Sequence, residues 1–429
     1  MNETTNTLAG KLKSLRAAAI GNMLEWFDWT LYGTFSVYLA RNLFDKTDPR
    51  SALLSTLAVF AVGFVARPAG GWLFGRFGDR LGRKVTMVVT MLLLALSSIG
   101  IALIPAYQDV GVLASVLLLF FRLLQGLAHG GETGVSYTYI AEIAPKERRG
   151  LWSSSVFVSV TIGVMAATGV AAALTSVLGA DGMNAYGWRI GFGIGGILGL
   201  YALVLRRSAE ESHVFEEKKD STVPAPRLSA REMWAVARNI VMLAAASNVA
   251  YYTWVTFAPS TAIAGGMDPS RAYWASLAAQ VLCIFWLPVC GWMSDRFGRK
   301  PMVTLWGLGV IVLTYPVSVM VNTEPHTLFM AQVLGLGAWS LLASIFPAVL
   351  SEQVPTQARA QGVGFVSSLS VAVFGGTAPY LNAYLAGSGY EGVYVGYVMF
   401  LGLLAVVAGL TIRETAGLDL AEVSASWKK

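Results

Sequence analysis

Two side chains of opposite charge lie deep inside apolar stretches of the sequence. Asp28 stands nine residues into an apolar segment that starts at residue 19, and Arg122 stands ten residues into one that starts at residue 112. At about 1.5 Å per residue, each charge would lie roughly 14–15 Å from its end of a helix. A charge costs about 2.5–3.5 kcal/mol at the centre of a bilayer. Two interpretations are open: a structural ion pair, or a carboxylate that takes up protons beside a guanidinium that binds an anion.

Three other ionisable residues accompany this pair. Glu25 precedes Asp28 by about one helical turn and could share its proton or act as a structural carboxylate. His129 and Glu132 follow Arg122 at offsets of 7 and 10, which puts the three on one broad helical face. His129 is a candidate proton relay, although a lone histidine in a membrane helix is more often a hydrogen-bonded packing residue. Only 3 histidines occur, they are scattered, and they predict no metal site.

The composition indicates what must position these residues. Hydrophobic residues make up 55% of the 429 and charged residues only 13%, whereas a soluble protein carries about 25% charge. Long unbroken apolar runs, such as residues 85–104, favour helices over the alternating segments of a barrel. We therefore predict an all-α integral membrane protein with twelve transmembrane helices. The predicted spans are 19–40, 53–75, 85–105, 112–141, 152–176, 188–206, 239–262, 271–293, 302–322, 327–350, 361–386 and 391–413.

The basic residues predict the orientation of the chain. Most of the 31 lysines and arginines lie at the N-terminus, in the loops after even-numbered spans and at the C-terminus. The positive-inside rule then predicts a multi-pass plasma (inner) membrane protein with both termini in the cytoplasm. The basic residues are scattered over short loops, so we expect no nucleic-acid partner.

An internal repeat divides the chain. Residues 75–84 read GRFGDRLGRK and residues 291–300 read GWMSDRFGRK, an offset of 216. A second motif repeats at an offset of 210, with Glu142 and Glu352 at its start. Both pairs lie on one predicted side of the membrane. The repeat predicts two six-helix bundles, residues 1–206 and 239–429, related by a pseudo-two-fold axis along the membrane normal and joined by a cytoplasmic linker, 207–238.

These motifs carry a family resemblance. The repeated GxxxDRxGRK resembles the loop signature of the major facilitator superfamily. Residues 21–33 (GNMLEWFDWTLYG), 67–84 and 122–134 (RLLQGLAHGGETG) resemble its metabolite:proton symporter branch, and residues 358–381 are similar to the α-ketoglutarate permeases. The resemblance implies a symporter that imports a small organic acid, such as a dicarboxylate or the 2-oxo acid α-ketoglutarate, by alternating access. It implies the proton as coupling ion, no other cofactor, a lipid environment and a monomer.

The resemblance also assigns roles in the first half. Asp28 and Arg122 occupy places where sugar porters of the superfamily carry a proton-coupling Asp/Arg pair. We expect ionised Asp28 to hold Arg122 directly and protonation to free the guanidinium for a substrate carboxylate. Glu25 is the second candidate for proton coupling, and His129 and Tyr32 are candidate substrate ligands.

The second half has no ionisable residue at comparable depth in spans 7, 8, 10 or 11, so it must recognise substrate with neutral groups. Asn248, Tyr251 and Tyr252 fall on one stripe of span 7, and Gln280 is a candidate from span 8. Tyr252 is the preferred residue, because the resembled branch also has tyrosine there. Tyrosine is equally common in packing and at membrane interfaces.

The repeated motifs suggest a gate. We expect Asp79 and Asp295 to face the N-terminal ends of neighbouring helices and the guanidinium groups of Arg149 and Arg359. The same residues could simply fix the loop topology. The predicted gating set is Asp79, Arg83, Asp295, Arg299, Arg149, Arg359, Glu142 and Glu352.

Other functional classes fit less well. The sequence has no HExxH, GxSxG or GxxxxGK[ST], so we expect neither an enzyme nor a nucleotide-driven pump. Citrate, shikimate, an aromatic acid, proline and betaine remain alternative cargoes. Proton-driven drug export is a further alternative, although a buried cation such as Arg122 favours an imported anion.

Overall fold

The computed structural model describes residues 8–45, 49–220 and 229–420. Residues 221–228 of the predicted linker and the last nine residues of the second predicted bundle lie outside that range. The described chain forms two compact units. Unit 1 combines Met1–Tyr139, Ser159–Glu216 and Ala360–Ser368, and unit 2 combines Ile140–Val158, Glu217–Arg359 and Leu369–Lys429. Unit 1 therefore includes a short segment from the second half of the sequence, and unit 2 includes a short segment from the first half.

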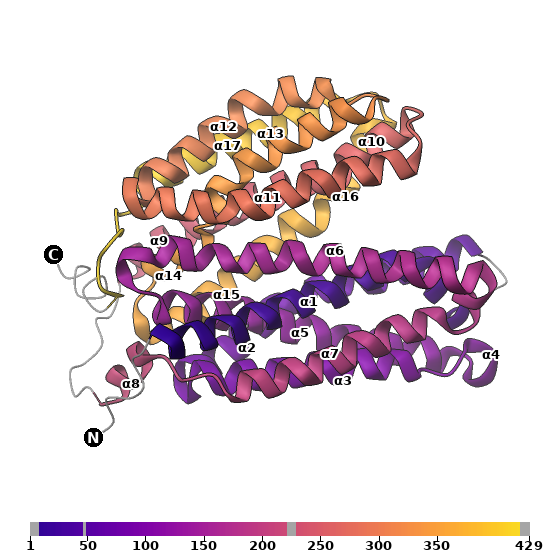
Figure 1. The fold of residues 1–429 in the computed structure, drawn as a ribbon, viewed down its shortest axis with the longest axis horizontal. Coiled ribbons are helices and arrows are strands. Elements are labelled where there is room, and N and C mark those ends of the chain that lie inside the picture. Colours follow the sequence, from indigo (N-terminus) through magenta and orange to yellow (C-terminus); the bar gives the residue numbers. More distant parts are fainter. Residues whose placement is uncertain (1–7, 46–48, 221–228, 421–429) are drawn as a thin grey trace. The chain divides into compact units, whose positions relative to one another are not determined.

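Long helices make up the first half of the chain (Figure 1). They are α1 (Leu8–Leu43), α2 (Pro49–Leu81), α3 (Arg83–Leu103), α4 (Tyr107–Val110), α5 (Val112–Ile143), α6 (Arg149–Gly182), α7 (Trp188–Arg207) and α8 (His213–Asp220). A π-helical turn, Met183–Gly187, precedes α7. Continuous helices are expected here because, in lipid, each backbone N–H and C=O group must be satisfied within its own segment.

The second half is more broken. It contains α9 (Ala230–Tyr252), α10 (Ala258–Ala264), α11 (Pro269–Phe297), α12 (Arg299–Met320), α13 (Pro325–Ala343), α14 (Phe346–Gln353), α15 (Arg359–Ser370), α16 (Gly376–Gly387) and α17 (Glu391–Thr411). π-Helical turns at Thr253–Phe257 and Val371–Gly375 separate α9 from α10 and α15 from α16. Such turns are rare and often mark functional sites.

One predicted span needs correction. We predicted a continuous span at 327–350, but the helix breaks between α13 and α14, because Pro347 has no N–H to donate to the preceding turn. Helix α9 begins at Ala230, so it includes the end of the predicted linker as well as the start of predicted span 7. Ser229 and Glu232 form a capping box there: each side chain accepts a hydrogen bond from the backbone N–H of the other.

Helical runs of the described chain are long enough for a membrane. Nine of them have the length and hydropathy of a span. One, Lys146–Arg207, is 62 residues long and bends at Gly179, where φ is 65°, so it supplies two predicted spans. Helices α1 and α2, which carry buried charges, are outside these nine runs and account for the first two predicted spans.

Close helix packing positions the charged residues of unit 1. A Cβ atom at Gly130 on α5 would come within 1.9 Å of the Arg67 carbonyl oxygen on α2, and one at Gly70 within 1.9 Å of the Leu127 carbonyl oxygen. Only glycine permits α2 and α5 to approach this closely. Helix α1 packs on α7 through Phe35 and Phe192, whose ring centroids lie 6.3 Å apart. These contacts bring α1, α2, α5 and α7 around one buried region (Figure 1).

Candidate functional site

Three carboxylate and three arginine side chains are buried together among these helices of unit 1, beside His129. Each is at most 5% exposed. When the carboxylates are ionised and His129 is neutral, the formal charges of the six cancel. Buried charges persist only when they are paired in this way. We call these residues the charged cluster: Glu25, Asp28, Glu132, Arg67, Arg122 and Arg206.

Gln125 connects Asp28 with Arg122. The amide nitrogen of Gln125 donates to Asp28, and its carbonyl oxygen accepts from Nη1 of Arg122 at 2.8 Å. Ser98 on α3 donates to the other carboxylate oxygen of Asp28. The predicted direct contact of Asp28 with Arg122 needs correction, because the amide of Gln125 links the two groups. Gln125 shares a helical face with Arg122 because it follows three residues later.

Aromatic rings enclose two of the guanidinium groups. Cζ of Arg122 lies 4.2 Å from the centre of the Trp29 ring and 4.1 Å from that of Tyr32. Cζ of Arg67 lies 4.0 Å from the same Trp29 ring. Cation–π contacts contribute about 2 kcal/mol when the cation is desolvated. The Tyr32 hydroxyl donates to the carbonyl oxygen of Thr56 at 3.1 Å, so Tyr32 contributes its ring face to Arg122.

Glu25 lies beside His129. Oε1 of Glu25 is 2.7 Å from Nδ1 of His129, and both side chains are buried. The rings of Trp26 and Trp29 lie 5.7 and 5.2 Å from the His129 ring. The structure thus brings His129 to a carboxylate of α1, where a proton could be shared between the two groups.

Glu132 is held by Arg206, the last residue of predicted span 6. The guanidinium donates to both carboxylate oxygens, at 2.5 and 2.8 Å, and both side chains are fully buried. Thr90 on α3 donates to the same carboxylate at 2.8 Å. A Cβ atom at Gly21 would overlap the guanidinium at 1.7 Å, so this glycine makes room for Arg206. The pair therefore ties α5 to α7 in a fixed geometry.

The neutral stripe of unit 2 lies on α9 immediately before a π-helical turn. Asn248, Tyr251 and Tyr252 are half-buried. Asn248 donates to the Ala244 carbonyl oxygen of its own helix at 2.7 Å. The Tyr251 ring lies 5.1 Å from the Trp339 ring, and a Cβ atom at Gly375 would be 3.4 Å from Tyr252. The stripe thus faces α13 and the second π-helical turn.

The remaining predicted ligand of unit 2 is hydrogen-bonded within its own helix. Gln280 on α11 is half-buried, and its amide donates to the Ser276 carbonyl oxygen of its own helix at 3.4 Å. The Trp339 indole donates to Ser247 at 3.2 Å, which fixes α13 against α9. Gln280 is therefore held by its own helix, whereas Tyr251 is held by a neighbouring one.

The two copies of the GxxxDRxGRK motif adopt matching geometries. Asp79 accepts from the backbone N–H groups of Ala360 and Gln361 at 3.2 and 2.9 Å, at the start of α15. Asp295 accepts from those of Gly150 and Leu151 at 2.7 and 2.8 Å, at the start of α6. Each carboxylate thus meets a helix N-terminus, where the helix dipole favours a negative charge.

Both copies are also stabilised within the motif itself. Arg83 lies 2.9 Å from Asp79, and Arg299 lies 2.9 Å from Asp295. The preceding residues, Gly82 and Gly298, have φ values of 113° and 104°. Since residues with a side chain rarely adopt such values, glycine is required at this position of each copy.

Arg149 and Arg359 bind the glutamates of the second repeated motif. Arg149 lies 2.8 Å from Glu352 and Arg359 lies 2.9 Å from Glu142, so this motif pairs its own arginines and glutamates. Glu352 also lies 3.3 Å from Arg299. The predicted contact of Arg149 with Asp295 is corrected accordingly, because Asp295 pairs with Arg299.

Two carboxylates that we did not predict cap the helices after the motif. Glu211 accepts from the backbone N–H groups of Arg83 and Lys84, and Glu414 accepts from those of Arg299 and Lys300. Burial raises the pKa of Glu211, and the backbone N–H groups that it binds act in the opposite direction. The matching positions of the two glutamates extend the internal repeat beyond the motif.

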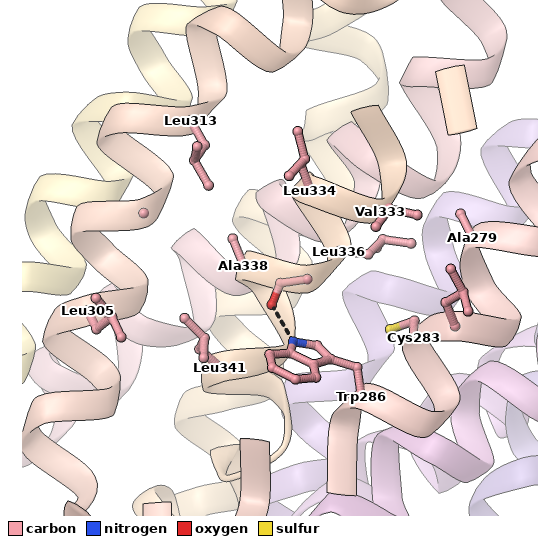
Figure 2. A pocket seen from close by; sticks show the side chains of 13 residues that line it. Ala279, Cys283, Trp286, Leu305, Leu313, Val333, Leu334, Leu336, Ala338 and Leu341 are labelled. Atoms are coloured by element: carbon pink, nitrogen blue, oxygen red, sulfur yellow. Dashed lines mark hydrogen bonds between the residues drawn. The ribbon is translucent and has the colours of Figure 1, made fainter. Parts of the chain in front are cut away.

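A separate hollow of about 430 Å³ lies in unit 2 (Figure 2). It is lined by apolar side chains of α11, α12 and α13, among them Cys283, Leu313 and Leu336. Trp286 lies at its edge and donates to the Gly337 carbonyl oxygen at 3.1 Å. An organic anion would find no charged partner among the lining residues, so we do not place the substrate there.

Comparisons with known proteins agree with this architecture. The family described as "Sugar (and other) transporter" matches residues 15–231, and the family described as "Major Facilitator Superfamily" matches residues 244–425. An alpha-ketoglutarate permease of Escherichia coli is 32% identical over 98% of this chain and 100% of its own length. This chain belongs to the major facilitator superfamily.

Other relatives in the superfamily carry different cargoes. A citrate-proton symporter of Klebsiella pneumoniae is 32% identical over 90% of this chain and 88% of its own length. A proline/betaine transporter of Salmonella typhimurium is 30% identical over 96% and 85%. A solved proton:xylose symporter has a TM-score of 0.82 at 18% identity, covering 98% of this chain and 99% of its own. The twelve-helix fold and the multi-pass membrane character are thereby confirmed, and the chain is a transporter rather than an enzyme.

The residues that we missed share a physical reason. Gln125 and Ser98 are uncharged, so they do not stand out in an apolar run as Asp28 and Arg122 do. Arg206 stands at the end of its apolar run and resembles an ordinary loop cation. A signal existed for Arg206: Glu132 stands in the predicted cytoplasmic half of span 4, and of the two arginines of span 6, Arg189 and Arg206, only Arg206 stands at the cytoplasmic end.

Proposed function

We propose that this chain is a proton-coupled symporter that imports a small organic acid, such as α-ketoglutarate, by alternating access. The observation that carries the proposal is the chain of hydrogen bonds from Asp28 through Gln125 to Arg122. The names of its relatives support it, because they include a permease for α-ketoglutarate and a citrate-proton symporter. Citrate, shikimate, an aromatic acid, proline or betaine is the alternative cargo.

Charge balance explains why proton and anion would load together. The charged cluster is neutral when empty, so a single proton leaves it with a net positive charge. A monoanionic organic acid at the cluster cancels that charge, and a dianion such as α-ketoglutarate cancels the charge of two protons. In a medium of low dielectric constant the neutral states are strongly favoured, so reorientation is least costly when both ligands or neither is bound.

Gln125 would link the protonation of Asp28 to the binding of an anion by Arg122. While Asp28 is ionised, it accepts from the Gln125 amide nitrogen, and the amide oxygen is left to accept from Arg122. A protonated Asp28 carries an O–H donor, which the amide oxygen can accept once the amide turns over. Arg122 then loses the hydrogen bond to Gln125, and this part of its guanidinium can bind a substrate carboxylate.

We assign the remaining roles by position. Glu25 with His129 is a second place for a proton, and Tyr32 packs against the guanidinium that binds the anion. The half-buried groups of α9, Asn248, Tyr251 and Tyr252, and Gln280 of α11 would recognise the uncharged part of the cargo. The two motif networks around Asp79 and Asp295 would form and break as the carrier opens and closes.

The remaining parts of the proposal concern the setting of the carrier. We infer an inner-membrane location with both termini in the cytoplasm from the distribution of lysine and arginine. The carrier would work as a monomer, with the proton as coupling ion and no further cofactor.

Counterflow in proteoliposomes tests the function. Vesicles loaded with unlabelled α-ketoglutarate should take up radiolabelled α-ketoglutarate, and a panel of citrate, shikimate, proline and betaine ranks the alternatives. Asp28→Asn should abolish accumulation driven by a proton gradient and preserve counterflow, because the asparagine amide cannot release a proton. Asp109→Asn, at an exposed position of α4, is the matched control. Gradient-driven accumulation by Asp28→Asn would falsify the coupling role of Asp28.

A further inference from the structure

A second hollow of unit 2 lies where the beginning of α9 meets the ends of α14 and α17. Its volume is about 250 Å³. Three arginines line it, Arg231, Arg238 and Arg413, together with one carboxylate, Glu232. None of these residues belongs to the charged cluster or to the two motif networks.

The hollow has an excess of positive charge. Glu232 is engaged by Ser229, whose backbone N–H and hydroxyl donate to it at 2.8 and 2.7 Å. Arg238 donates to the neutral side-chain oxygen of Asn239 at 3.2 Å. Guanidinium groups bind phosphate oxygens in bidentate fashion, and three arginines line this hollow. The chemistry therefore favours an anion with several oxygens.

The surroundings indicate that the anion belongs to a lipid. The hollow lies at the first turns of α9 and just beyond Thr411, the last residue of α17, so it is level with the boundary of the spans. Met233 and Trp234 on the same turns of α9 are 54% and 66% exposed. Tryptophan at the end of a span anchors at the lipid headgroup level, and an apolar side chain beside it can cover an acyl chain.

We propose that this hollow binds the phosphate headgroup of an anionic phospholipid such as phosphatidylglycerol. The headgroup lies between α9 and α17, which already touch through a hydrogen bond of 3.2 Å from Thr411 to Asn239. A bound lipid strengthens this contact, since it joins Arg238 of α9 to Arg413 beyond α17. Basic pockets between membrane helices are known to recognise such headgroups.

Native mass spectrometry of the purified full chain tests the proposal. Phosphatidylglycerol should bind at least about tenfold more tightly than phosphatidylcholine, because the choline ammonium offsets the charge of the phosphate and is repelled by the three arginines. The combined variant Arg231→Gln, Arg238→Gln and Arg413→Gln should remove that preference. Its control is Arg16→Gln, Arg207→Gln and Arg296→Gln, which removes the same charge at exposed positions elsewhere and should keep the preference.

Three outcomes would overturn the proposal. Equal loss in the two combined variants would mean that net charge alone attracts the lipid. Thermal protection by inorganic phosphate equal to that by phosphatidylglycerol would make the hollow a site for soluble anions. If the glutamine variant fails to fold, a second variant replaces the same three arginines: Arg231→Lys, Arg238→Lys and Arg413→Lys. This lysine variant keeps the charge and should bind phosphatidylglycerol with intermediate affinity. Wild-type affinity in the lysine variant would reject a bidentate site.

Discussion

The two units differ in the kind of polar group that they bury in the middle of their helices. In unit 1, six charged side chains are almost fully buried, and they contact one another, Gln125, His129 and aromatic faces. In unit 2, the stripe on α9 formed by Asn248, Tyr251 and Tyr252 is neutral and half-buried. The repeated motifs, in contrast, are nearly identical in the two units, down to the positive φ of Gly82 and Gly298.

This difference indicates where the repeat has diverged. Both copies keep the groups at the helix ends, where Asp79 meets α15 and Asp295 meets α6 in the same way. The buried middle of the helices is free to differ, since charges there are costly and are retained only where they act. We therefore expect substitutions of polar groups in the buried middle of the helices to be severe in unit 1 and mild in unit 2.

The largest effect is expected at the pair of Glu132 and Arg206. Glu132→Gln leaves a fully buried guanidinium without its counter-charge, which costs about 3–5 kcal/mol of folding stability. Thermal unfolding in detergent, followed by size-exclusion chromatography, should show a strongly destabilised protein. Retention of wild-type stability would mean that this pair is dispensable and that unit 1 tolerates unpaired charge.

A double variant separates charge from packing at this place. Glu132→Leu with Arg206→Met removes both charges and keeps apolar volume, so stability should return to near the wild-type value. Thr90 keeps the Thr86 and Met87 carbonyl oxygens as acceptors, so no new unsatisfied group is created by the change. Failure of the double variant to recover stability would indicate that the shape of the pair, rather than its charge, supports unit 1.

A smaller, functional effect is expected at Arg122. Arg122→Lys conserves the charge but removes the planar fork that binds Gln125 and would bind a carboxylate. Uptake of the organic acid should fall about 100-fold, roughly 2.7 kcal/mol, with the protein still folded. Arg207→Lys, at an exposed position of the same unit, is the control and should transport normally. Uptake by Arg122→Lys near the wild-type rate would reduce Arg122 to a structural cation.

Part of the site in unit 1 could be predicted from the positions of its charged residues alone. Asp28 and Arg122 stand out in the sequence because apolar runs surround them, and the repeated motif identifies Asp79 and Asp295 as equivalent. The membrane spans follow from hydropathy, apart from breaks such as that at Pro347. These features depend on composition and local spacing, which the sequence contains directly.

The partners of these residues were not predictable in the same way. Gln125 between Asp28 and Arg122, and His129 beside Glu25, depend on the rotation of α5 against α1, which is fixed by packing. The pairing of Arg149 with Glu352 joins residues 203 positions apart. A single sequence records the groups that need partners but not the rotation of each helix that selects them.

The smallest effect is expected at Tyr252 in unit 2. Tyr252→Phe removes one neutral hydroxyl, and a neutral hydrogen bond to substrate contributes about 0.5–1.5 kcal/mol, so KM should rise by roughly two- to tenfold with little change in maximal rate. The dependence of uptake on the proton gradient should be unaffected, because α9 has no ionisable group at this level. Tyr380→Phe, at a position 75% exposed on α16, is the matched control. If Tyr252→Phe instead uncouples uptake from the proton gradient, proton coupling extends into unit 2. The contrast between a charged unit 1 and a neutral unit 2 would then not describe where coupling occurs.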